Sequence, residues 1–171
     1  MAWWSEALGD IFGAGRKPSH PVAAALQDLI RRRSLPRPLL ETLIEARRER
    51  LFSAVADGEG ALAWADKVAG SMALLAARVL DPEAPQDPVR LGGRAFGLGQ
   101  LIRSGALAPQ IGAPLLQQSL AQANAALSGL SARAFPAVAA ATLARHRRSD
   151  GQLSEISQQL RLVVAVARGR L

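Results

Sequence analysis

Residues 91–105 have the sequence LGGRAFGLGQLIRSG, and this stretch decides the fold. Its apolar residues recur at helical spacing, which predicts a helix whose core-facing side consists of Leu91, Ala95, Leu98 and Ile102. A second side is small and weakly polar and consists of Gly93, Gly97, Gln100 and Ser104. Each glycine in a helix interior costs about 1 kcal/mol relative to alanine. Close approach of another helix or of a ligand must offset that cost.

The rest of the chain also has helical patterns and no strand or hairpin pattern. The predicted fold is all-α, a bundle of six or seven helices, with one domain over residues 1–171. Helical patterns occur over eight segments, one more than the upper value of this count: 3–12, 21–33, 38–56, 60–80, 91–105, 114–128, 134–148 and 153–168. The strongest of them, 60–80, has its apolar stripe at Trp64, Val68, Met72, Leu75 and Val79.

Composition and charge exclude some kinds of functional site and favour one class of partner. Cysteine is absent, which excludes disulfides, thiolate metal sites and a cysteine nucleophile. Between Pro88 and Ser149 there is no Asp or Glu, so this span carries a charge of +7. Its basic residues are Arg90, Arg94, Arg103, Arg133, Arg145, Arg147 and Arg148. Such a span favours an anionic partner, namely phosphate, an anionic membrane surface or an acidic protein, although solvated arginines would explain it equally well.

The sequence motifs give only weak support for the active sites of common enzyme classes. Residues 92–99 are glycine-rich, but no strand precedes them and the spacing does not fit a dinucleotide loop. His146 lies among arginines, a poor place for a metal cation. Glu41, Glu45 and Glu49 are spaced by one helical turn and could hold magnesium, yet arginines lie among them, so a solvated charged face is favoured. We therefore expect no metal and no cofactor.

Three blocks together resemble the squalene/phytoene synthase family, the head-to-head isoprenoid synthases. They are residues 35–47 (LPRPLLETLIEAR), 64–72 (WADKVAGSM) and 93–104 (GRAFGLGQLIRS). The first is similar to the family helix that ends with an acidic residue in the cavity, the second to the helix with the motif vAG.vG.L, and the third to the helix with lG.A.QlTNilRD. The resemblance covers nearly the whole chain, but only the later part of a family chain, so we expect a truncated isoprenoid synthase bundle that lacks the N-terminal part.

Further residues resemble a degenerate branch that includes the complex I assembly factor of squalene/phytoene synthase type. These are residues 3–8, 20–22, 135–137 and 141–145. Two departures from the family pattern also indicate a degenerate branch. The family arginine is kept as Arg103, but Ser104 replaces the aspartate that binds magnesium and diphosphate, and Arg50 stands where the family has a cavity aspartate.

The resemblance implies a degenerate ligand cavity with no catalytic residue and no metal ligand. Its members would be Glu45, Gly93, Arg94, Gly97, Gln100, Arg103 and Ser104. Without carboxylates a metal cannot stabilise a departing diphosphate, so we expect a non-catalytic binding, assembly or structural subunit, with complex I assembly as one role. The alternative is a protein that binds a prenyl diphosphate or lipid, or a residual prenyltransferase.

The missing helices would leave an apolar groove, filled by a protein partner, a second copy or an isoprenoid lipid. No apolar run is long enough to span a membrane. We expect a cytoplasmic protein, peripheral at the inner membrane (in the mitochondrial matrix in a eukaryote) through the arginines and Trp3-Trp4. Nucleic acid is not an expected partner, because no recognised binding motif occurs.

Overall fold

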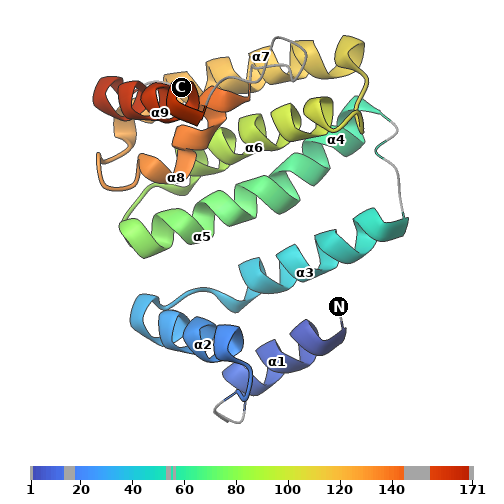
Figure 1. The fold of residues 1–171 in the computed structure, drawn as a ribbon, viewed down its shortest axis with the longest axis vertical. Coiled ribbons are helices and arrows are strands. Elements are labelled where there is room, and N and C mark those ends of the chain that lie inside the picture. The colour runs from blue at the N-terminus through green and yellow to red at the C-terminus, as the bar shows by residue number, and fades with distance from the viewer. Residues whose placement is uncertain (1, 14–17, 53–54, 56, 145–154, 170–171) are drawn as a thin grey trace. The chain divides into compact units, whose positions relative to one another are not determined.

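The computed structural model describes residues 2–13, 18–52, 55, 57–144 and 155–169, without the side chains at 50–52 and 155–158. These residues form helices and connecting turns and no strand, which confirms the all-α prediction (Figure 1). Counted as continuous runs, the described helices number eight, one more than the upper expected value. Among the described residues, every helix is too short or too polar to serve as a membrane span.

The chain divides into two compact units, Met1–Ser53 and Ala54–Leu171. The expected single domain stays a prediction. The first unit contains α1 (Ala2–Phe12), α2 (Pro21–Arg33) and α3 (Arg37–Phe52). The start of α2 is as the sequence predicts, because Pro21 opens the helix and the Nδ1 atom of His20 accepts a hydrogen bond from the Val22 amide at 3.2 Å.

The second unit begins with one nearly continuous helical run. It consists of α4 (Gly58–Ala65), a π-helical segment (Asp66–Gly70) and α5 (Ser71–Leu80). The sequence predicts an uninterrupted helix over 60–80 and misses the π-helical segment, which inserts a wider turn at its middle. Asp57 caps the start of α4, since its Oδ1 atom accepts a hydrogen bond from the Gly60 amide at 2.7 Å.

The decisive stretch forms α6 (Gln86–Arg103), which lies at the centre of the second unit (Figure 1). The helix begins five residues earlier than predicted, because Pro88 falls within the first turn, where the missing N–H has no helical partner. It ends before Gly105, whose φ of 72° lies in the left-handed region that glycine adopts readily.

The elements that follow α6 complete the second unit. They are α7 (Pro109–Ala126), a short 3₁₀ turn (Leu127–Gly129), α8 (Pro136–Ala139), a second 3₁₀ turn (Ala140–Leu143) and α9 (Glu155–Arg168). Two predictions are wrong here. Residues 109–113, expected to be irregular, form the first turn of α7, and the helix expected from 134 is only a short α-helix followed by a 3₁₀ turn.

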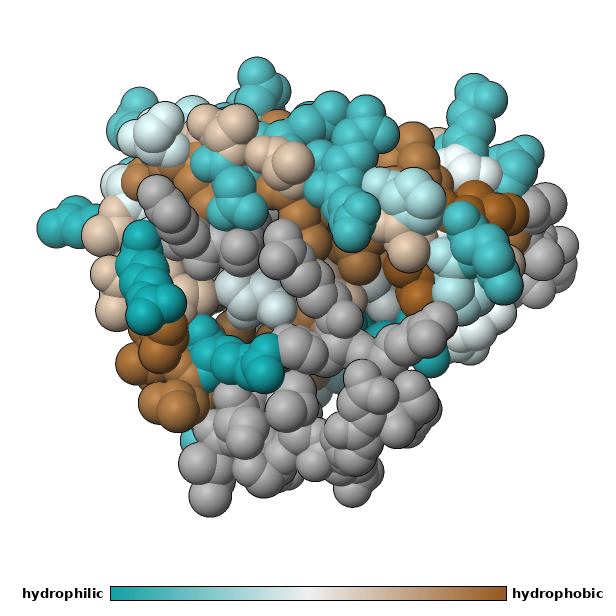
Figure 2. Space-filling view, turned by 90° about the horizontal axis from the view of Figure 1, so that it is seen from above, coloured by the Kyte–Doolittle hydropathy of each residue, from teal (hydrophilic) through white to brown (hydrophobic). Residues whose placement is uncertain are grey.

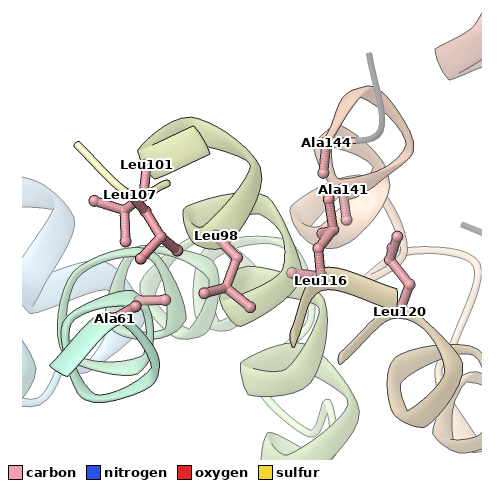
Figure 3. Packing of buried hydrophobic residues seen from close by; sticks show 10 residues of the cluster. Ala61, Leu98, Leu101, Leu107, Leu116, Leu120, Ala141 and Ala144 are labelled. Carbon is pink, nitrogen blue, oxygen red and sulfur yellow. The ribbon is translucent and has the colours of Figure 1, made fainter. Parts of the chain in front are cut away.

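The core of the second unit joins α4, α6, α7 and the second 3₁₀ turn (Figure 3). Leu98 and Leu101 of α6 are fully buried, as are Leu107 and Leu120. Many of the remaining core residues are alanines, so the helix axes approach closely and the core is built from small side chains. In the space-filling view, hydrophobic residues also reach the surface in patches between hydrophilic ones (Figure 2).

Candidate functional site

The small side of α6 is occupied by another helix of the same chain. A Cβ atom added to Gly93 would lie 2.5 Å from the carbonyl oxygen of Ala69 and 2.8 Å from the Cα atom of Gly70. A Cβ added to Gly97 would lie 2.9 Å from the Cβ of Ala69 and 3.0 Å from that of Ala65. These glycines therefore let α6 contact α4 and the π-helical segment backbone to backbone, and helix packing offsets their cost in helix propensity.

The surface that meets α6 is a row of alanines, which the sequence analysis did not single out. Every fourth residue of the run is a buried alanine, namely Ala61, Ala65, Ala69, Ala73 and Ala77. The predicted core stripe of larger side chains is confirmed only in part: Trp64 packs against the core, Val68, Leu75 and Val79 are half-buried, and Met72 is 58% exposed. Small residues face the glycines because only they permit so short a distance between helix axes.

A second close approach lies on another side of α6. A Cβ added to Gly99 would lie 2.7 Å from the Cα atom of Ala144 and 2.8 Å from its carbonyl oxygen. The end of the second 3₁₀ turn therefore packs against the α6 backbone. Three of the glycines in α6 are thus explained by contacts within the chain.

Arg94 is held by a carboxylate. Its Nε and Nη2 atoms donate to Oδ1 and Oδ2 of Asp66, each at 2.7 Å, which is the bidentate geometry of a strong arginine–carboxylate pair. The two side chains are 24% and 27% exposed. Asp66 opens the π-helical segment, so the pair fastens α6 to the point where the neighbouring helix widens. The role of Asp66 could not be predicted from the sequence, because nothing local connects residues 28 positions apart.

Arg103 is directed to the backbone of the second 3₁₀ turn. Its Nη1 atom donates to the carbonyl oxygens of Leu143 at 2.8 Å and Ala144 at 3.4 Å. The guanidinium also lies 6.0 Å from the centre of the Phe96 ring. Burial lowers the pKa of Arg103 from its usual value. Arg103 therefore donates hydrogen bonds to carbonyl oxygens at the end of the second 3₁₀ turn, where a positive charge is favourable.

The two other α6 positions assigned to the cavity do not belong to the packed side. Gln100 is exposed. Ser104 is exposed as well and follows the helix, with its hydroxyl donating to the Leu101 carbonyl oxygen at 3.1 Å. The small side of Gly93, Gly97, Gln100 and Ser104 therefore has two parts: its first half is buried against α4 and the π-helical segment, and its second half reaches solvent.

The seventh assigned residue, Glu45, belongs to the first unit and is an exposed residue of α3. On the same helix, Glu41 accepts a hydrogen bond from Arg37 at 2.7 Å in an i, i+4 ion pair, as expected for a solvated charged face. Within the described part of the chain, no three His, Asp or Glu residues gather to hold a metal ion. Arg145, His146, Arg147 and Arg148 lie outside the described residues, as does the side chain of Arg50.

Comparison with models of protein families gives a match over nearly the whole chain. The family model of squalene/phytoene synthase matches residues 1–167. Comparison with curated proteins and with solved structures gives no match. The all-α fold agrees with the helical fold of that family, and the family match covers nearly the whole chain. This chain therefore belongs to the squalene/phytoene synthase family.

Proposed function

We propose that this chain is a non-catalytic member of the family that acts as a binding or assembly subunit. One observation carries the proposal: four of the α6 positions assigned to the cavity are engaged within the chain. Gly93 and Gly97 are closed by helix contact, and Arg94 is paired with Asp66. In a family synthase, as the resemblance implies, the corresponding helix presents its residues to a diphosphate.

The electrostatics of α6 support the same proposal. Transfer of a prenyl group requires stabilisation of a departing diphosphate, which the family achieves with magnesium held by carboxylates. Ser104 stands where the resemblance implies one of these carboxylates, and a hydroxyl carries no charge. Arg103, the adjacent cation, already donates to two backbone carbonyl oxygens. A diphosphate would have to displace these contacts and would find no metal-binding acid at the end of the helix.

Turnover and binding of a prenyl diphosphate test the proposal. The purified chain is incubated with farnesyl or geranylgeranyl diphosphate and magnesium, and released diphosphate is measured beside an active family synthase. We expect no release above the buffer control. Magnesium-dependent release would overturn the proposal. Saturable calorimetric binding without turnover would replace the assembly role with the alternative, a protein that binds prenyl diphosphates.

For the assembly role we propose a protein partner, and within this class the finer proposal is assembly of respiratory complex I. This finer proposal rests on the resemblance of residues 3–8, 20–22, 135–137 and 141–145 to that branch. Deletion of the coding sequence in the host, followed by native electrophoresis of the respiratory complexes, tests it. We expect loss of assembled complex I and its recovery on complementation. Normal assembly in the deletion strain would contradict the complex I role and leave the non-catalytic proposal to the turnover assay.

A further inference from the structure

The helix α9 turns a broad apolar face toward solvent. Leu160 is 62% exposed and Val163 is 63% exposed, and Val164 and Val166 are exposed as well. The first three are spaced i, i+3, i+4 and form one stripe. Ala165, on the opposite side, is buried where α9 packs against α8 and the second 3₁₀ turn. The second unit therefore packs against α9 (Figure 1) on the side of Ala165, and the aliphatic side of the helix is exposed.

The charges around this face are positive. Arg161 and Arg168 are exposed and lie three residues before and four residues after Val164, so they border one edge of the aliphatic stripe. Glu155, the first residue, is the one acid in the sequence of α9. The chain as a whole has a net charge of +7, and its acid-free span, 88–149, precedes α9. An occupant of this face must therefore be apolar where it meets the stripe and anionic where it meets the arginines.

We infer that α9 lies on an anionic lipid surface, with its axis parallel to the membrane and its aliphatic stripe in the acyl region. An amphipathic helix of this kind places leucine and valine below the headgroups, while long arginine side chains reach back to the lipid phosphates. Attraction between the basic chain and anionic lipids adds to the apolar contribution.

The side chains of the stripe favour a lipid over a protein occupant. The exposed residues are leucine and valines, which are under-represented among the residues that dominate protein–protein binding, and the stripe contains no aromatic anchor. A second copy would bring two chains of charge +7 together and place arginines beside arginines. The inference goes beyond the proposed function and does not depend on it, since a synthase and a non-catalytic protein could use the same helix.

Vesicle co-sedimentation of the full chain tests the inference. The vesicles contain phosphatidylcholine alone or phosphatidylcholine mixed with phosphatidylglycerol. We expect sedimentation with the mixed vesicles, weakened by added salt because the charge attraction is screened. The double variant Leu160→Asn, Val163→Asn should lower the partition coefficient at least about tenfold, since it removes two aliphatic side chains from the acyl region.

The matched control is Met72→Gln, a change from an apolar to a polar residue at a 58% exposed position on α5. It should bind as the unchanged chain does. Circular dichroism and thermal unfolding show that each variant is folded. Three results would overturn the inference: equal sedimentation with both vesicle types, full binding by the folded double variant, or a dimer of the unchanged chain that the double variant breaks without any vesicle binding.

Discussion

Gly93 is the residue at which the packing of α6 leaves least room. The nearest atom to an added Cβ is the carbonyl oxygen of Ala69, at 2.5 Å, and a backbone atom cannot rotate away. Gly93→Ala should therefore destabilise the chain by about 1–3 kcal/mol, because overpacking outweighs the gain of about 1 kcal/mol in helix propensity. Urea unfolding measures this change.

Gly129 supplies the matched control for that variant. It lies in the same unit, and no atom lies within 4 Å of an added Cβ. Gly129→Ala should stay within about 0.5 kcal/mol of the unchanged chain. If Gly93→Ala proved equally neutral, close backbone contact would not explain the glycines of α6, and a ligand would again be needed to account for them.

The Asp66–Arg94 ion pair should show an energetic coupling between its two side chains. Arg94→Met leaves a half-buried carboxylate without its partner, which should cost about 1–3 kcal/mol of stability. Asp66→Asn combined with Arg94→Met should cost less than the sum of the single changes, because the unpaired charge is gone. A double-mutant cycle by urea unfolding gives the coupling energy. Additive effects would show that the pair contributes nothing beyond its separate side chains.

Asp81 gives a prediction for pH. The Ser131 hydroxyl and the Glu83 amide donate to its carboxylate and hold the pKa of Asp81 below its usual value of 3.8. A lowered pKa in the folded state means that the contribution to stability is present above the unfolded value and is lost as pH falls through the folded pKa. Ser131→Ala should raise the pKa of Asp81, as followed by NMR titration.

Ser131 also accepts a hydrogen bond from the Ala134 amide at 3.2 Å, so its removal changes the start of α8 as well. The variant Ser131→Thr keeps a hydroxyl for both hydrogen bonds and is the conservative control. It should leave the pKa of Asp81 close to that of the unchanged chain. An unchanged pKa of Asp81 with Ser131→Ala would assign the lowered pKa to another group.

Arg103 is expected to hold the second 3₁₀ turn against α6. Arg103→Met removes the donor to the Leu143 and Ala144 carbonyl oxygens. Amide exchange in residues 138–144 should then become faster by about one to two orders of magnitude, the effect of losing a charged hydrogen bond of about 1.5–3 kcal/mol. Hydrogen exchange measured by mass spectrometry follows this segment.

Arg90 provides the comparison for that variant, because it is an exposed arginine of the same helix. Arg90→Met removes the same charge and should leave exchange in residues 138–144 unchanged. If both variants accelerated exchange equally, the cause would be the net charge of α6. If neither did, Arg103 would not be a positioning residue for the turn.

The elements also show how much of the fold and site the sequence could predict. Helix positions follow from periodicity, and the glycines of α6 correctly indicate a close approach. Periodicity could not identify what approaches, since the alanine row at 61, 65, 69, 73 and 77 looks weakly apolar beside the larger stripe of Val68 and Met72. Which residues are buried depends instead on the distance between the helix axes, and a short distance favours small side chains. The partners of Arg94 and Arg103 lie 28 and 40 residues away, where no local pattern reaches.

The proposal that the chain has lost catalysis also predicts how its melting temperature responds to magnesium and diphosphate. A ligand that binds the folded state alone stabilises it by about 2.7 kcal/mol at one hundred times its dissociation constant. Because Arg94 and Arg103 are engaged within the chain and residue 104 is a serine, magnesium with inorganic diphosphate should leave the melting temperature unchanged. Sodium sulfate at equal ionic strength corrects for general anion effects on a chain of charge +7. A rise in melting temperature that needs both magnesium and diphosphate would show that the family's ligand site has survived, and a protein that binds prenyl diphosphates would then replace the assembly role.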